Sequence, residues 1–162
     1  MQRRTTSWAA AMAVAWAVGS APVARTVESA PPLGAMLEEY ARVQGALATD
    51  RIDGVATAAA KLVVLAKREP GDSAAKAAAS RLALAAGAMT GFDIGVLREQ
   101  LKELSMALAR VVDASGAASA EIFYCPMADG FWLQPKGDEV LRNPYYGKSM
   151  PTCGVKVESV ED

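Results

Sequence analysis

The strongest constraint on the fold is a helical spacing of apolar residues that runs from residue 33 to about residue 114. Apolar side chains recur there every three or four residues, which is the spacing of one face of an α-helix. Turn-forming segments interrupt the pattern and divide it into four helices. The sequence therefore predicts a mainly α fold that begins with a four-helix up-down bundle. The apolar face of its first helix comprises Leu33, Met36, Tyr40, Val43 and Leu47.

Acidic residues at the turns indicate where the later helices begin. We expect Asp50 to cap the second helix, the segment Glu69-Pro70-Gly71-Asp72 to cap the third and Asp93 to cap the fourth, because a carboxylate accepts hydrogen bonds from a helix's first N–H groups. The third helix is mostly alanine, which allows neighbouring helices to approach closely. The fourth helix has the clearest period, with Ile94, Leu97, Leu101, Leu104, Leu108 and Val111 on one face.

The pattern changes after Ser115-Gly116. Two short extended runs, 121–124 and 131–134, predict strands on either side of a turn at Asp129-Gly130. Apolar and polar residues alternate over 155–160, which predicts a terminal strand. The sequence thus predicts a short irregular or β C-terminal segment packed against the bundle. Its aromatic residues are expected to form a second small core between the segment and the helices; they are Phe123, Tyr124, Phe131, Trp132, Tyr145 and Tyr146.

The N-terminal residues have the pattern of an export signal. Arg3 and Arg4 precede an apolar stretch that is shorter than the ~20 residues of a membrane span, and small residues follow it. We expect 1–24 to be a signal peptide, 25–32 a linker and 33–162 a single domain. An uncleaved anchor is the alternative. We therefore expect a periplasmic or secreted bacterial protein that has no stable membrane span after the signal is cleaved.

The chain contains no histidine. Without imidazole, Ser-His-Asp and Cys-His catalysis and histidine-based zinc or Cu(II) sites are excluded, and an enzyme is not expected. Basic and acidic residues nearly balance, at 17 and 18, and no basic stripe carries interleaved aromatic residues. A nucleic-acid partner is therefore not expected.

Four sulfur-bearing residues stand in two short clusters of the tail, between 121 and 154. Cys125 and Met127 are two residues apart, and Met150 and Cys153 are three apart. Thiolate and thioether donors select soft metals, above all Cu(I), so these residues are the candidate copper ligands. Two alternatives stay open for the cysteines. They could form a disulfide, which is the common state in an exported chain, or one of them could be a reactive thiol. The methionines could equally fill the core.

The tail also resembles a known family. The residues that carry the resemblance are Tyr124-Cys125-Pro126-Met127-Ala128, Gly130, Trp132-Leu133, Arg142-Asn143-Pro144-Tyr145-Tyr146-Gly147, Met150 and Cys153-Gly154. They are similar in type and spacing to a small domain of unknown function found alone in secreted bacterial proteins. The same domain occurs fused to the C-terminus of CusB-type periplasmic adaptors of heavy-metal efflux pumps. The resemblance covers about residues 36–154.

The resemblance implies a helical bundle with a metal-linked C-terminal segment that acts in copper or heavy-metal handling. Its partners would be the metal ion and a heavy-metal efflux adaptor or transporter. The alternative function is a disulfide-stapled interaction module that docks on a transport partner without binding metal.

Overall fold

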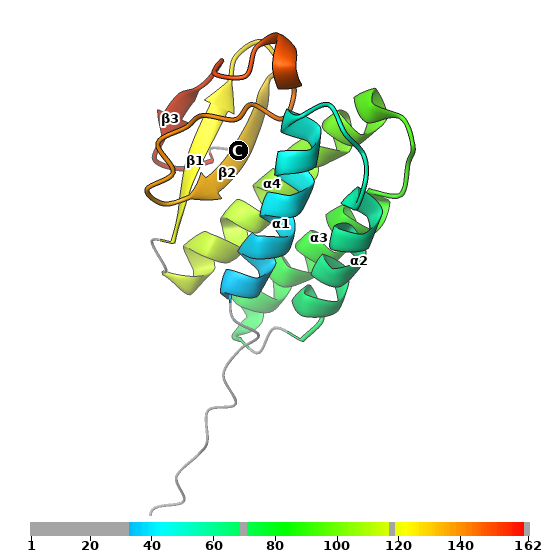
Figure 1. Ribbon diagram of the computed structural model, residues 1–162. Coiled ribbons are helices and arrows are strands. Elements are labelled where there is room, and N and C mark those ends of the chain that lie inside the picture. The colour runs from blue at the N-terminus through cyan, green and yellow to red at the C-terminus, as the bar shows by residue number, and fades with distance from the viewer. Residues whose placement is uncertain (1–32, 69–70, 117–118, 161–162) are drawn as a thin grey trace, which may run out of the picture.

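The computed structural model describes residues 33–68, 71–116 and 119–160, and within them the fold is mainly α, as predicted. Helices and a small antiparallel sheet follow one another along the chain (Figure 1). The predicted signal peptide, 1–24, and linker, 25–32, lie outside the described residues. The elements are α1 Leu33–Ala48, α2 Val55–Ala66, α3 Ser73–Ala88, α4 Ile94–Ser115, β1 Ala120–Cys125, β2 Gly130–Pro135, the 3-10 turn η1 Gly147–Ser149 and β3 Val155–Val157.

Two of the three predicted helix caps are confirmed. Asp72 accepts a hydrogen bond from the Ala75 N–H, and Asp93 accepts one from the Val96 N–H, both at 2.9 Å. The predicted cap at Asp50 is wrong, because α2 begins at Val55 behind Gly54, whose φ of 80° only glycine adopts freely.

Asp50 instead follows α1 with a φ of 57°, and its carboxylate binds a side chain of α4. The partner is the Arg98 guanidinium, at 2.6 Å. A charged donor forms a stronger hydrogen bond with a carboxylate than a backbone N–H does, so the carboxylate is directed to Arg98.

The tail forms a sheet with strand order β2-β1-β3. β1 and β2 make the predicted hairpin, with Tyr124 opposite Phe131 and Cys125 opposite Gly130. β3 pairs with the other edge of β1 and is shorter than predicted, ending at Val157. β2 packs on α1 and α4, and Figure 1 shows α2 and α3 on the side of the molecule away from the sheet.

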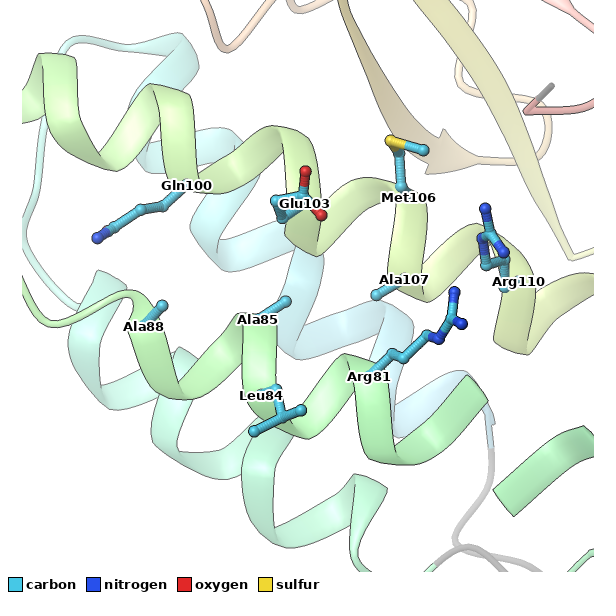
Figure 2. Close-up of a pocket in the computed structure, with 9 residues that line it drawn as sticks. All are labelled: Arg81, Leu84, Ala85, Ala88, Gln100, Glu103, Met106, Ala107 and Arg110. Carbon is cyan, nitrogen blue, oxygen red and sulfur yellow. The ribbon is translucent and has the colours of Figure 1, made fainter. Parts of the chain in front are cut away.

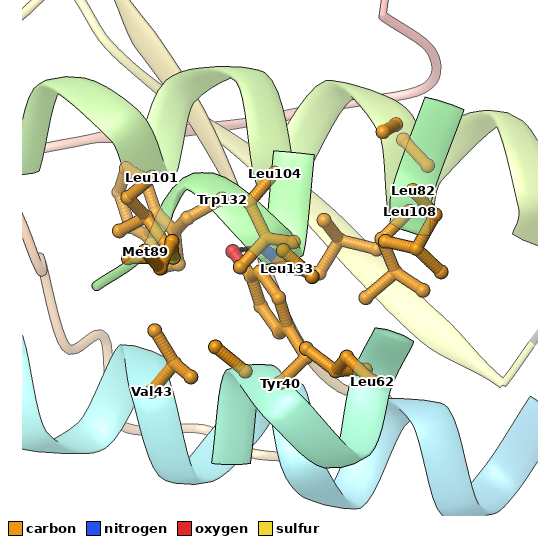
Figure 3. Close-up of a cluster of buried hydrophobic side chains, with 14 of the residues drawn as sticks. Tyr40, Val43, Leu62, Leu82, Met89, Leu101, Leu104, Leu108, Trp132 and Leu133 are labelled. Atoms are coloured by element: carbon orange, nitrogen blue, oxygen red, sulfur yellow. Dashed lines mark hydrogen bonds between the residues drawn. The ribbon is translucent and has the colours of Figure 1, made fainter. Parts of the chain in front are cut away.

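The core is continuous from the helices into the tail. Trp132 has 0% exposure, and with Phe123 and Tyr145 it belongs to the same buried cluster as the α4 leucines (Figure 3). The prediction of a second small core is therefore wrong, because β2 lies directly on the helices. Tyr124, Phe131 and Tyr146 stay partly exposed, and the rings of Tyr124 and Phe131 have centroids 4.9 Å apart on the other face of the hairpin.

Tyr40 joins the helices to the sheet by a buried hydroxyl. It lies 2.7 Å from the Ser105 Oγ of α4 and accepts a hydrogen bond of 3.2 Å from the Leu133 N–H of β2. Figure 3 shows its ring extending from α1 toward Leu133. Since β2 is an edge strand, this N–H has no strand to pair with. Burial raises the pKa of Tyr40 to about 12, so the hydroxyl stays neutral.

Replacing Tyr40 with Phe should lower the free energy of unfolding by about 1–3 kcal/mol, because a buried N–H and a buried hydroxyl lose their partner. Denaturant unfolding measures the change. Tyr124→Phe is the matched control, since its exposed hydroxyl donates only to Asp129, and it should cost no more than about 0.5 kcal/mol. Equal losses in the two variants would contradict the role given to Tyr40.

Candidate functional site

The two cysteines lie side by side although 28 positions separate them in the chain. Their Sγ atoms are 4.0 Å apart, and both are free thiols. Strand pairing explains the approach. Tyr124 of β1 is opposite Val155 of β3, and one further step along the register brings Cys125 opposite Gly154. The residue before Gly154 is Cys153, which the terminal strand therefore carries to the end of β1.

Gly154 is required for this approach. Its φ is 155°, and a Cβ there would lie 2.2 Å from the Cη2 atom of Trp132. Any side chain at this position would force the terminal segment off the indole ring, and Cys153 would move with it. The glycine after the second cysteine thus has a steric reason, which the sequence pattern does not reveal.

Asn143 connects both cysteines to the loop between the strands. Its side-chain Nδ2 donates to the Sγ of Cys125 at 3.2 Å and to the backbone carbonyl of Cys153 at 2.6 Å. Its Oδ1 accepts hydrogen bonds from the N–H groups of Tyr145 and Tyr146, at 2.7 and 3.2 Å. The side chain has 0% exposure, so these contacts replace every hydrogen bond that water would otherwise make.

Both backbone polar groups of Asn143 are also hydrogen-bonded. Its N–H donates to the Pro151 carbonyl at 2.7 Å, and its carbonyl accepts from the Gly147 N–H at 3.1 Å. One residue therefore holds the loop that contains Tyr145 and Tyr146, the turn that precedes Cys153, and the end of β1. Sequence analysis included Asn143 in a motif but gave it no role; a buried asparagine cannot be told from an exposed turn residue by sequence alone.

The two methionines have different surroundings. Met127 lies in the turn between β1 and β2 and is 64% exposed, so it does not fill the core. The Tyr146 hydroxyl donates to its backbone carbonyl at 3.2 Å. Met150 directly follows η1, is partly buried, and accepts a hydrogen bond from the Cys153 N–H at 3.4 Å through its carbonyl. The structure thus brings the two thiols together and places both methionines on the segments that carry them.

Burial favours the neutral form of the Cys153 thiol. Burial, and then the hydrogen bond and charge of Cys125, raise the pKa of Cys153 above its ordinary value of 9.0. A metal that binds the pair must therefore displace protons from it. Within the residues that the structure describes, no group of three or more cysteine and carboxylate side chains could hold a metal ion.

A second set of contacts fixes the same loop to the helices. Arg98 donates from Nε to the Pro144 carbonyl at 2.9 Å and from Nη2 to the Leu47 carbonyl at 3.0 Å. Asp50 accepts a third hydrogen bond from Arg98, from Nη2 at 2.6 Å, and also one from the N–H of Lys148, at 3.2 Å. Sequence analysis missed Arg98, because its position on a leucine-rich helix does not reveal a distant backbone partner.

Gly147 lies against this ion pair. Its φ is 52°, and a Cβ there would be 2.1 Å from the Asp50 Oδ1. Glycine is therefore needed where the loop crosses the end of α1.

Hollows of the described surface lie on the helices and also where the end of α4 meets the sheet. One of about 370 Å³ is formed by α3 and α4, where Figure 2 shows Arg81 and Leu84 projecting from α3 and Glu103 and Arg110 from α4. Another lies between α2 and α3. Neither of these two hollows is lined by a cysteine. The two cysteines lie together at the end of β1 instead.

Comparison of the chain with models of protein families, with curated proteins and with solved structures gives no match. Among the described helices, none combines the length and apolar character needed to cross a membrane.

Replacing Asp50 with Asn should make the protein less stable than the parent at neutral pH. This difference in stability should disappear in acid. The Arg98 guanidinium first, and then the Lys148 N–H, lower the pKa of the Asp50 carboxyl below 3.8. A lowered folded-state pKa stabilises the fold above the unfolded-state value, and this contribution is lost as the pH falls through the folded-state pKa. Unfolding temperatures of the two proteins across acidic pH measure the effect.

Asp53→Asn is the control for this comparison, because Asp53 is an exposed carboxylate of the same loop. Its unfolding temperature at neutral pH should equal that of the parent protein, because an exposed side chain contributes little to stability. A deficit in Asp50→Asn that stayed constant well below pH 3.8 would contradict the charge-based account.

Proposed function

We propose that this chain binds a soft metal ion, with Cu(I) as the cargo, between Cys125 and Cys153. The observation that carries the proposal is the pair of free thiols 4.0 Å apart, joined by the amide of Asn143. Metal-ligating side chains are commonly held in this way by a neighbouring hydrogen-bond donor or acceptor.

The thiol separation fits two ligands of one ion. With metal–sulfur bonds of about 2.3 Å, two sulfurs lie about 3.8 Å apart around a tetrahedral ion and at most about 4.6 Å apart around a linear one. The observed 4.0 Å lies between these limits.

The donor chemistry favours copper over zinc. A structural zinc site needs four thiolate or imidazole ligands, and this chain has two cysteines and no histidine. Thioethers are soft, neutral donors that suit Cu(I), so we propose Met127 and Met150 as the additional ligands. The side chain of Met127 is exposed in the turn that follows Cys125, so its thioether is not engaged in the core.

The cellular role follows from the resemblance of the tail motif to the efflux-associated domain. We infer a non-enzymatic role in copper or heavy-metal handling in the periplasm, with an efflux adaptor or transporter as the receiving partner. We also infer an up-down order for the four helices, which the packing of consecutive helices supports.

A disulfide-stapled interaction module is the second candidate, and the same thiol pair supports it. The sulfurs need to approach by about 2 Å to reach the bond length of a disulfide, about 2.05 Å. The two candidates differ in the state of the thiols in the exported protein. Free thiols with bound metal support the first, and a metal-free disulfide that resists mild reductant supports the second.

The reduced protein should bind one Cu(I), and Cys125→Ser and Cys153→Ser should each weaken binding by more than about 100-fold, because each removes one of two thiolates. Titration against a chromogenic Cu(I) chelator measures the affinity. Met127→Leu and Met150→Leu should weaken binding less, and Met106→Leu on α4 is the matched control that should not change it. Unchanged affinity in both cysteine variants would contradict the assignment.

Asn143→Asp should weaken Cu(I) binding by about 10–100-fold, because a carboxylate oxygen replaces the N–H donor beside the Cys125 sulfur. Gln134→Glu is the control. It changes another buried amide, whose partners are Trp132, Val140 and Arg142, none of them a sulfur. If both variants lost the same affinity, Asn143 would have only a general structural role.

A further inference from the structure

The two thiols differ in their access to solvent. Cys125 has 0% exposure at the end of β1, where its sulfur accepts a hydrogen bond from Asn143. Cys153 is partly exposed, in the loop that precedes β3. Cys153 is therefore the more accessible of the two residues to a dissolved reagent that reacts with thiols.

The buried thiol is nevertheless placed to react with whatever attaches to Cys153. The two sulfurs are 4.0 Å apart, and Asn143 binds both the Cys125 Sγ and the Cys153 carbonyl. Attack by Cys125 is then intramolecular, which gives it a large advantage over a second molecule from solution. The thiolate of Cys125 is the nucleophile in such a reaction.

We propose that Cys153 is a site of reversible thiolation by small disulfides and that Cys125 is its resolving thiol. The Cys153 thiolate attacks one sulfur of the small disulfide, whose S–S bond breaks, and a mixed disulfide forms on Cys153. The first small thiolate leaves and takes up the proton that Cys153 gave up. The Cys125 thiolate then attacks the Cys153 sulfur and expels the second small thiolate, which takes up the proton of Cys125. Overall, the protein loses two hydrogens and two electrons, and the small disulfide becomes two thiols.

This inference rests on the metal site proposed above and implies that oxidation of the two thiols regulates metal binding there. The disulfide uses both sulfurs that would bind the metal, so the oxidised protein has no thiolate for Cu(I). The ratio of small disulfide to small thiol around the protein then sets the fraction of chains able to take up metal.

The test uses the metal-free, reduced protein with oxidised glutathione as the probe, followed by acid quenching and intact-mass analysis. The parent protein should end as the form lacking two hydrogens, with no lasting adduct. Cys125→Ser should accumulate one glutathione on Cys153, because no resolving thiol remains. Cys153→Ser should form an adduct at least about tenfold more slowly, because Cys125 is buried.

Adduct formation in Cys153→Ser as fast as in Cys125→Ser would overturn the proposal, as would a lasting adduct on the parent protein. A second measurement guards against a variant that fails to fold. Brief alkylation of the parent protein, read by peptide mapping, should label Cys153 before Cys125, and the reverse order would also overturn the proposal. The assay contains no metal, so a failure to bind Cu(I) would contradict only the function proposed in the preceding subsection.

Discussion

The arrangement of the tail depends on the buried amide of Asn143. This residue makes six hydrogen bonds, four through its side chain and two through its backbone, to segments on both sides of the cysteine pair. A buried polar group left without its partner costs about 1–3 kcal/mol, so the surrounding loop has few other conformations that satisfy this amide. The positions of the two sulfurs follow from that constraint, since one sulfur and the carbonyl of the other cysteine bind the same nitrogen.

The helices serve as the support for this loop. Three polar side chains on otherwise apolar helix faces bind backbone groups of the tail: Tyr40 binds the Leu133 N–H, Gln44 the Arg142 carbonyl and Arg98 the Pro144 carbonyl. Two of these contacts flank Asn143 directly in sequence. The loop is thus fixed to α1 and α4 on one side and to the sheet on the other. A site held on both sides by packed elements loses little freedom when a ligand binds.

Local patterns predicted the elements of the fold well, and long-range contacts account for the errors. Apolar spacing located the helices, and Asp72 and Asp93 cap the helices they precede. Asp50 has the same local pattern, but Arg98, 48 residues away, binds its carboxylate, and no local rule reveals such a partner. The single core has the same origin, because packing of β2 on the helices depends on tertiary contacts that strand alternation does not encode.

The candidate site was predicted by residue type and not by geometry. The spacing of the cysteines left open whether they meet, and the pairing of β3 with β1 brings them together. The exposure of Met127 and the role of Asn143 depend on which side of the loop faces the core, which the sequence pattern does not specify.

The central claim is that Cys125 and Cys153 share one soft metal ion. X-ray absorption spectroscopy of the reduced protein loaded with one equivalent of Cu(I) tests this claim most directly. The account predicts a copper shell of sulfur atoms at about 2.3 Å that is disrupted when either cysteine is changed to serine. A shell dominated by nitrogen or oxygen, or the same sulfur shell in both serine variants, would contradict it.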